Sequence, residues 1–562
     1  MTAKKRKPMP IGIEDFRKLR EKYCFVDKTR FIRELLDSHG DVTLITRPRR
    51  FGKTLTLSML QYFFTLEQAE ENRKLFEGLD IERAGEEYMR EQGSRPVVFL
   101  TLKDVREWDF DSMISSLKEN LRWLYGNFRY VIEGNRLSKD DKAFFQSILD
   151  KSADVPSMQA ALKNLLHILE RYHGSKPILL LDEYDGPIQA AWAHGYYEKC
   201  IGFMRNFLSA ALKTNPSLDF AVLTGITRIS KESIFSGLNN LRVCSVLAKQ
   251  YSDIFGFTQT EATRLMEDCG VGDKLSELKQ WYDGYLFGDT EIYNPWSVIQ
   301  FVGNDCTFAA YWFNTSGNSI LRELLRDTDS SQETELIGLM RGEPIEAEIN
   351  ENIVYPEIYR NRDALYTMLL TTGYLKPFHL ETLHADSVSA SIPCQLVLPN
   401  REIRMAYHDE ILNYLTRDTG KTILRQMLRA MLEGDAVGFQ QRLQKILLNN
   451  ISFHDARESF YHGMMLGFSV LLEGIFHVKS NGESGHGRFD LAFFPRKEDV
   501  PGIILEFKTV KDGELLESAA KEALAQIEAK QYGAELQQQG VKEVWKYGIA
   551  FCKKRVWMER EA

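Results

Sequence analysis

A short basic loop near the N-terminus combines residue types that bind phosphate. It follows the apolar run VTLIT (42–46) and precedes LTLSMLQYFF (55–64), which predicts a helix. The loop consists of Arg47, Pro48, Arg49, Arg50, Phe51, Gly52, Lys53 and Thr54. The P-loop pattern is G-x-x-x-x-G-K-[ST]; its second glycine, lysine and threonine are present, and Arg47 replaces its first glycine. Backbone N–H groups of such a loop, at the N-terminus of a helix, favour bound phosphate.

A nucleoside triphosphate with Mg²⁺ gives each residue type in this loop an expected role. Gly52 lets the backbone approach the phosphates, Lys53 reaches the β- and γ-phosphates, and Thr54 places its hydroxyl on Mg²⁺. The three arginines add positive charge around the triphosphate or around a nucleic-acid phosphate. The alternative is an ordinary basic turn between a strand and a helix.

A second GKT tripeptide shows why its context matters. Gly420-Lys421-Thr422 follows a helix-like segment rather than an apolar strand. We interpret it as a glycine that ends one helix and the start of a new helix. The order strand, loop, GKT and helix occurs only at 42–64, so the phosphate site is predicted there.

Two further apolar runs supply the remaining parts of a nucleotide site. ILLLD (178–182) ends in Asp182, which we expect to hold Mg²⁺ through water, and Glu183 follows it as the group that polarises the attacking water. FAVLT (220–224) ends in Thr224, a candidate sensor of the γ-phosphate, and Arg228 is a candidate transition-state finger in cis or in trans. The alternatives are an acidic strand end, a helix-capping threonine and a surface arginine.

Several segments of the sequence resemble the AAA-ATPase-like domain family of prokaryotes. They are YCFVDKTRFIRELL (23–36), TRPRRFGKTLTLSML (46–60), LLLDEYDGPI (179–188) and LTGITRISKESIFSGLNN (223–240). WYDGYLFG (281–288) and YNPWS (293–297) resemble the continuation of that family. The resemblance covers about half of the chain, and it implies an ASCE-type P-loop fold that uses ATP and Mg²⁺.

Two acids and a lysine near the C-terminus form a second candidate site. Asp490 lies in GRFDL (487–491), and Glu506 and Lys508 lie in IILEFK (503–508). Alternate residues of a strand share a face, so Glu506 and Lys508 do so, and a neighbouring strand would bring Asp490 beside them. Paired carboxylates bind Mg²⁺, which activates a water, and a lysine can orient or deprotonate that water. The alternative is a chance E-x-K on an ordinary strand.

These phrases, with SNGES (480–484) and KEALAQIEAKQY (521–532), resemble the PD-(D/E)XK nuclease domain that is often fused behind the family above. The resemblance implies Gln526 as a further polar residue of the active site. Glu458 or Glu473 is a weaker candidate for an acid from the first helix. Phe489 stands where a proline usually precedes the first acid.

The helices and strands that must position these sites fall into regions that differ in their sequence pattern. Short apolar runs alternate with helices over 10–255, which predicts a parallel α/β sheet covered on both faces. We expect four regions in all. They are a basic tail (1–9), an AAA-like P-loop ATPase domain (10–255), a helical middle or lid domain (256–450) and an αβββαβ restriction-endonuclease-like domain (451–562).

Composition excludes several classes of protein. The 562 residues carry a formal net charge of −8, which argues against binding nucleic acid by bulk positive charge. The sequence contains no run of about 18 apolar residues, so we expect no membrane span. The 7 cysteines are scattered without a CxxC pair, which is typical of buried thiols in a reducing compartment, so we expect a cytoplasmic protein.

The combined expectation is an ATP-binding and ATP-hydrolysing protein with an Mg²⁺-dependent nuclease domain. ATP would regulate the cleavage or processing of nucleic acid, DNA rather than RNA. The alternative is an ATP-dependent conformational switch whose nuclease-like domain binds nucleic acid or a partner without cutting. The sequence leaves a homo-oligomer open.

Overall fold

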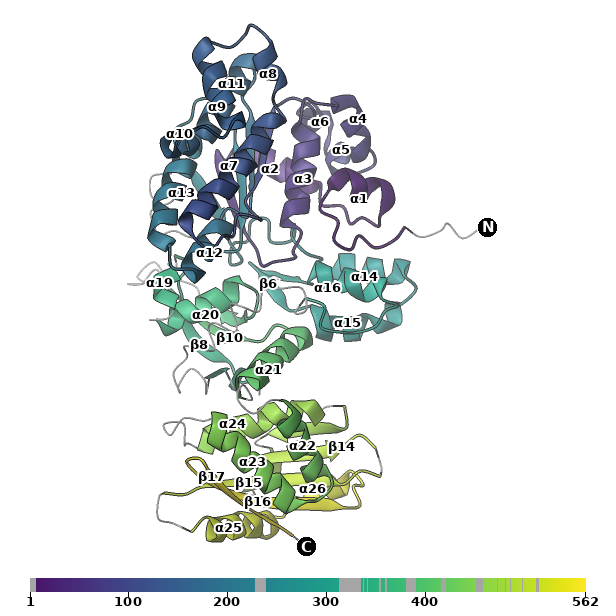
Figure 1. The fold of residues 1–562 in the computed structure, drawn as a ribbon. Coiled ribbons are helices and arrows are strands. Elements are labelled where there is room, and N and C mark those ends of the chain that lie inside the picture. The colour runs from purple at the N-terminus through teal and green to yellow at the C-terminus, as the bar shows by residue number, and fades with distance from the viewer. Residues whose placement is uncertain are drawn as a thin grey trace, which may run out of the picture. The chain divides into compact units, whose positions relative to one another are not determined.

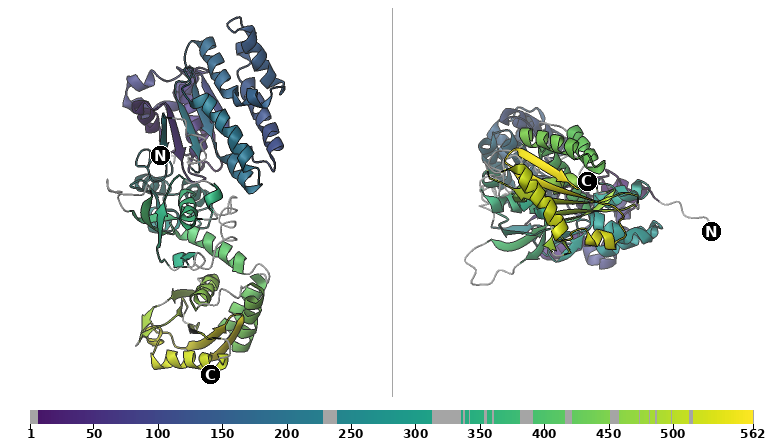
Figure 2. Two further views of the ribbon diagram at one scale, coloured as in Figure 1. Left: turned by 90° about the vertical axis from the view of Figure 1, so that its left-hand side faces the viewer. Right: turned by 90° about the horizontal axis from the view of Figure 1, so that it is seen from below.

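The computed structural model divides the chain into two compact units, each described here by itself (Figures 1 and 2). Unit 1 comprises Met1–Thr315 and Ala347–Glu402, and unit 2 comprises Ser316–Glu346 and Ile403–Ala562. The domain boundaries at 255 and 450 stay predictions. The structure describes residues 7–227, 239–312, 335–336, 338–340, 342–352, 355–358, 361–380, 391–415, 421–450, 458–472, 474–480, 482–485, 487–497, 499–511 and 515–561.

A parallel sheet forms the centre of unit 1, as the apolar runs predict. Its strands are β1 (Val42–Thr46), β2 (Val97–Thr101), β3 (Ile178–Asp182), β4 (Ala221–Gly225) and β5 (Leu241–Cys244). The order is β2-β3-β4-β1-β5, and each pairing is parallel. The three inner strands are buried along their whole length, because helices cover both faces (Figure 2). The carboxyl ends of β1, β3 and β4 therefore meet at one edge of the sheet.

The helices of this region alternate with the strands. They are α1 (Phe16–Lys22), α2 (Arg30–Ser38), α3 (Lys53–Phe64), α4 (Ala69–Arg73), α5 (Asp80–Ala84), α6 (Glu86–Met89), α7 (Phe110–Gly126), α8 (Tyr130–Glu133), α9 (Lys139–Leu149), α10 (Val155–Gln159), α11 (Ala161–His173), α12 (Gly186–Ala193) and α13 (Tyr197–Leu212). Short 3₁₀ turns occupy Lys74–Phe76, Gly272–Lys274 and Val470–Leu472. Helix α3 directly follows the predicted phosphate loop.

The stretch over 256–450 is less purely helical than its texture predicts. Its helices are α14 (Gln259–Asp268), α15 (Leu275–Tyr282), α16 (Pro295–Gly303), α19 (Tyr355–Ile358), α20 (Arg362–Thr371), α21 (Arg401–Leu415), α22 (Lys421–Leu432) and α23 (Ala436–Asn450). Its strands are β6 (Tyr285–Phe287), β7 (Thr290–Ile292), β8 (Ile345–Ile349), β9 (Lys376–Leu380) and β10 (Ile392–Val397). Strands β6 and β7 form a hairpin, and β8, β10 and β9 form a second small sheet. Lys421 and Thr422 of the second GKT begin helix α22, in agreement with the predicted helix start; Gly420 lies outside the described residues.

A mixed sheet forms the centre of unit 2. Its elements are α24 (Glu458–Ser469), β11 (Phe476–Ser480), β12 (Glu483–Ser484), β13 (Gly487–Arg488), β14 (Leu491–Pro495), β15 (Gly502–Thr509), α25 (Leu516–Ala529), α26 (Ala534–Gln538), β16 (Val544–Cys552) and β17 (Arg555–Arg560). The sheet order is β11-β14-β15-β16-β17, with β15 and β16 parallel and the other pairs antiparallel. The β12–β13 ribbon, α26 and β17 add to the predicted helix, three strands, helix and strand.

Two further properties concern membrane-spanning helices and cysteines. Within the described residues, none of the helices combines the length and the apolar character needed to cross a membrane. Each of the seven cysteines is a free thiol, and Cys200, Cys244, Cys394 and Cys552 are buried.

Candidate active sites

The predicted phosphate loop turns the chain from β1 into α3 through a left-handed backbone. Arg50 and Gly52 have φ angles of 70° and 84°. Gly52 caps α3, and its carbonyl accepts the backbone N–H and the hydroxyl of Thr56, each at 3.0 Å. A positive φ is costly for residues other than glycine, so the loop path explains the glycine at position 52.

Lys53 is buried at the centre of this loop. Its ammonium donates to the backbone carbonyls of Arg47 and Pro48, each at 2.9 Å. Burial lowers the pKa of Lys53, and the nearby carboxylates of Glu183, Asp182 and Asp185 oppose that shift. The ammonium thus donates to two neutral carbonyls. A bound triphosphate would give this positive charge an anionic partner. This donor set fits a phosphate ligand.

Asp182 joins the ends of three elements at the same edge of the sheet. Its two carboxylate oxygens accept the hydroxyls of Thr54, at 2.7 Å, and Thr224, at 2.5 Å. The side chain is buried, and this burial raises the pKa of Asp182 against the effect of the two hydroxyls and Lys53. A carboxylate and a threonine hydroxyl are oxygen ligands of the kind that Mg²⁺ prefers, so these residues fit that ion.

Glu183 and Asp185 follow β3 and serve different contacts. Glu183 has a φ angle of 50°, and its carboxylate accepts from Arg106 Nη2 at 2.9 Å. Asp185 is buried, and its Oδ2 accepts the backbone N–H groups of Ile226 and Thr227 at 2.9 and 3.1 Å. Asp185 thus holds the turn after β4, a role that the sequence analysis missed although Asp185 is the second aspartate of DEYD. Arg228 lies outside the described residues.

The three arginines of the loop point to different surroundings. Arg47 is fully buried, and its guanidinium donates to the carbonyls of Thr46, Cys244, Ser245 and Tyr251 at 2.6–3.1 Å. This differs from the expected charge beside a triphosphate, because the side chain ties β1 to the segment after β5. Arg49 is half-buried and donates to Gln189 at 3.3 Å. Arg50 is exposed, with its guanidinium carbon 4.3 Å from the ring centroid of Trp296.

The loop is supported by residues far along the chain. The buried ring of Phe51 packs at 5.0 Å from Tyr285 and 5.2 Å from Phe287. A Cβ at Gly373, where φ is +88°, would lie 3.0 Å from the Pro48 ring, so that glycine lets the two segments touch. Since neither contact is local, the loop motif alone gives no signal of either.

Trp312 and Glu402 continue this support. The Trp312 indole N–H donates to the carbonyl of Arg49 at 3.1 Å, and its backbone N–H donates to the Glu402 carboxylate at 2.6 Å. The hydroxyl of Ser297 donates to the other oxygen of Glu402 at 2.7 Å. Burial raises the pKa of Glu402 to about 7. Sequence reasoning missed both residues, because each acts through a contact with a distant segment.

The carboxylates of Asp490 and Glu506 lie together in unit 2. Leu491 pairs with Leu505 in the antiparallel ladder of β14 and β15, so the next position brings Asp490 opposite Glu506. The backbone N–H of Asp490 donates to Glu506 Oε2 at 3.4 Å, and the backbone N–H of Phe507 donates to Asp490 Oδ2 at 2.7 Å. Glu506 is buried, whereas Asp490 is half-buried. The predicted convergence of these two acids is present.

Lys508 and Gln526 complete this group. The Lys508 ammonium donates to Gln526 Oε1 at 2.7 Å, and the Gln526 amide donates to Glu506 and, at 3.1 Å, to the hydroxyl of Tyr532. Gly548 is the register partner of Glu506 on β16, and a Cβ there would lie 2.2 Å from the Ala520 carbonyl of α25. The glycine therefore lets α25 lie close to the sheet, which brings Gln526 over the two strands.

Two further residues, His462 and Tyr532, lie near this group. Nε2 of His462, on α24, lies 3.0 Å from the backbone carbonyl oxygen of Asp490, and Tyr532 contacts Gln526. Among the described residues, no group of three His, Cys, Asp or Glu side chains is arranged to hold a metal. The carboxylates of Asp490 and Glu506 are nevertheless hard oxygen donors, which fit Mg²⁺. Glu473 and the side chain of Glu458 lie outside the described residues.

Comparisons with known proteins match the two regions of the chain that contain these sites. Residues 10–235 match a sequence family described as "Predicted AAA-ATPase", and residues 456–561 match the "PD-(D/E)XK nuclease superfamily". A curated protein of Azotobacter chroococcum mcd 1, named "Uncharacterized protein in vnfD 5'region", is 30% identical over 329 residues. That match covers 57% of this chain and 57% of the relative. The chain therefore contains an AAA-ATPase-like domain over 10–235 and a PD-(D/E)XK nuclease superfamily domain over 456–561, as the resemblance implies.

Proposed function

We propose that this protein hydrolyses ATP at the loop between β1 and α3 and cuts nucleic acid, DNA rather than RNA, with Mg²⁺ at the C-terminal site. ATP binding or hydrolysis regulates the cutting. The observation that carries the proposal is the convergence of Asp490 and Glu506 on neighbouring strands, with Lys508 on the same face as Glu506.

At the C-terminal site, each side chain has a part in phosphodiester hydrolysis. Asp490 and Glu506 would hold Mg²⁺, which as a Lewis acid lowers the pKa of a water molecule. Lys508 orients the attacking water or stabilises the negative charge that develops on the phosphate. Gln526 accepts from the Lys508 ammonium and donates to Glu506, so it holds the two groups at a fixed separation.

At the first site, the chain binds the tail of ATP. Lys53 exchanges its two loop carbonyls for the β- and γ-phosphates, while Thr54 and Asp182 would hold Mg²⁺. Glu183 polarises the attacking water once its carboxylate leaves Arg106. Thr224, bonded to Asp182, links the end of β4 to the same centre and senses the γ-phosphate.

The test is a cleavage assay on linear, circular and single-stranded DNA and on RNA, with Mg²⁺ and with or without ATP. We expect cutting that ATP changes, and that Lys508→Ala abolishes. Lys511→Ala is the matched control, because Lys511 lies after the end of β15 and is exposed. Identical behaviour of wild type and Lys508→Ala on all substrates would refute the nuclease proposal.

One observation favours the second candidate, an ATP-dependent switch that binds nucleic acid without cutting. The Gln526 amide donates to Glu506 and accepts from Lys508, and the Phe507 N–H donates to Asp490, so other groups of the protein already bond these charged side chains. ATP-dependent binding of DNA with no product under any metal condition would select this switch.

A further inference from the structure

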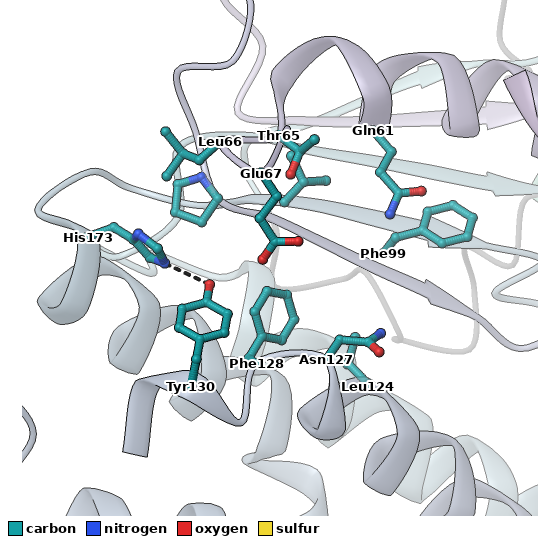
Figure 3. Close-up of a pocket in the computed structure, with 12 residues that line it drawn as sticks. Gln61, Thr65, Leu66, Glu67, Phe99, Leu124, Asn127, Phe128, Tyr130 and His173 are labelled. Carbon is teal, nitrogen blue, oxygen red and sulfur yellow. Dashed lines mark hydrogen bonds between the residues drawn. The ribbon is translucent and has the colours of Figure 1, made fainter. Parts of the chain in front are cut away.

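A cavity of about 260 Å³ opens beside the edge strand β2, apart from both candidate active sites (Figure 3). It is bounded by the end of α3 and the following turn, the start of β2, the end of α7, α8 and the end of α11. The strands of this sheet are parallel, and the phosphate loop follows the carboxyl end of β1. Residues at the start of β2 line the cavity, so it lies toward the amino ends of the strands, at the edge opposite to the phosphate loop.

The cavity has an apolar floor with two aromatic rings. Phe99 projects from β2 and is half-buried, and Phe128 follows α7 with 7% of its surface exposed. Leu66, Pro96, Val97 and Leu124 complete the apolar lining. Aromatic rings that line a concave site favour flat or cationic groups, because the face of an aromatic ring carries negative charge density.

The polar lining is rich in hydrogen-bonding groups and carries one formal charge. Its members are Gln61, Thr65, Glu67, Asn127, Tyr130 and His173. The Tyr130 hydroxyl and His173 Nε2 are 3.0 Å apart, and Glu67 points into the space above Phe128 and toward Tyr130 (Figure 3).

The paired side chains of Tyr130 and His173 are both neutral, so the Glu67 carboxylate determines the charge of the cavity. Burial, together with the positive charge of Arg136, lowers the pKa of His173, so this imidazole is neutral at pH 7. Burial raises the pKa of Tyr130, to which Glu67 also contributes, so the phenol keeps its proton. Neither lysine nor arginine is among the residues that line the cavity, so its net charge is negative.

We propose that this cavity binds a flat organic cation, an amidine, guanidine or protonated amino-heterocycle, whose ring lies against Phe128 and Phe99 and whose N–H groups donate to Glu67. Asn127 and Gln61 offer amide donors and acceptors to the edge of such a ring. A ligand that carries phosphate or carboxylate is disfavoured, because Glu67 would repel it and neither lysine nor arginine is among the residues that line the cavity. The site is distinct from the proposed ATP site, whose ligand is anionic, and the inference does not rest on that function.

Benzamidine and benzoate form a matched pair of probes, because both are flat rings of similar size with opposite charge. Saturation-transfer NMR on the full chain should show benzamidine bound with millimolar affinity and benzoate unbound. Glu67→Gln should weaken benzamidine binding at least tenfold. Glu70→Gln is the matched control, because Glu70 is exposed on the neighbouring helix α4 and does not line the cavity.

A second variant tests the ring face. Phe128→Leu keeps an apolar side chain but removes the π-face, and we expect benzamidine to bind severalfold more weakly. Three results would overturn the proposal: no benzamidine signal at 10 mM, equal binding of benzoate, or full benzamidine binding to Glu67→Gln. Because Glu67 is exposed, its replacement by Gln should leave the fold intact, which circular dichroism of the variant checks.

Discussion

The two candidate active sites differ in how far along the chain their supporting residues come from. In the C-terminal site, the bonds that join Asp490 to Glu506 and Phe507, and Gln526 to Glu506 and Lys508, span 16–20 positions of sequence. In the first site, the bond from the Trp312 indole to the Arg49 carbonyl spans 263 positions. One site is local, and the other is assembled from distant segments.

The difference also extends to the type of bond. The charged side chains of the C-terminal site bond one another through Gln526. Lys53 of the first site instead bonds backbone carbonyls, and the loop that carries them is packed against Phe287, Gly373 and Trp312. We infer that side-chain changes within the motif should disable either site. Changes at remote positions should affect the first site more than the second.

Removal of the lysine at the centre of the loop is the largest expected effect. Lys53→Ala should lower ATP turnover by at least 100-fold, because the variant loses the buried ammonium that we assign to the β- and γ-phosphates. The measurement is phosphate release under saturating ATP, with Mg²⁺ binding at the C-terminal site followed in parallel. Lys421→Ala, in the second GKT, is the control and should keep full turnover. Retained turnover in Lys53→Ala would contradict the assignment of the loop.

The sequence predicted those parts of the fold that depend on local patterns. Strands β1, β3 and β4 were predicted because they are continuous apolar runs, and each is buried along its length. The β6–β7 hairpin was not predicted, although Gly288-Asp289 between YLF and TEI is a typical two-residue hairpin loop. Short strands of three residues carry too little periodicity for detection beside amphipathic helices.

The candidate sites were predictable to the same extent. The convergence of Asp490 with Glu506 follows from strand alternation and antiparallel pairing, which are short-range rules. The contacts of Glu402 and Trp312 with this site could not be predicted, because no local pattern links a glutamate at a helix start or a tryptophan in an aromatic-rich turn to a distant loop. The burial of Arg47 was missed for a related reason, since only the position of β5 shows that carbonyls surround its guanidinium.

Replacement of Glu402, the buried carboxyl that accepts the Trp312 backbone N–H, should change the pH dependence of the stability of unit 1. The pKa of Glu402 is raised from 4.5 to about 7, so between these values the folded chain keeps a proton that the unfolded chain releases. Stability therefore falls as pH rises from 4.5 to 7, by about 3 kcal/mol at most. Glu402→Gln removes this loss and should gain stability relative to wild type as pH rises.

Denaturant unfolding from pH 5 to pH 8, followed by the transition of unit 1, measures this difference. Glu277→Gln on α15 is the control, because Glu277 is exposed, and its difference from wild type should not vary with pH. A Glu402→Gln curve parallel to that of wild type would show that the carboxyl is ionised in the folded protein.

A methyl group added at Gly548 on β16 should disturb the C-terminal site by displacing helix α25. The Cβ of Gly548→Ala would lie 2.2 Å from the Ala520 carbonyl and 2.5 Å from the Leu524 nitrogen, so α25 must move away and carry Gln526 with it. We expect a roughly tenfold fall in the cutting rate and about 2 kcal/mol of destabilisation, with ATP turnover unchanged. Gly533→Ala is the control, because its nearest neighbour is 3.9 Å away. Wild-type cutting by a folded Gly548→Ala would exclude a positioning role for Gln526.

The smallest expected effect tests the longest contact. Trp312→Phe keeps an aromatic ring against Tyr374 but removes the N–H that bonds the Arg49 carbonyl. Loss of one such bond is worth about 1 kcal/mol, so we expect the KM for ATP to rise about fivefold, with the cutting rate in the absence of ATP unchanged. Trp123→Phe on α7 is the control, because 65% of that side chain is exposed. If Trp312→Phe left the KM unchanged while Lys53→Ala abolished turnover, the first site would be as local as the second, and the contrast between them would fail.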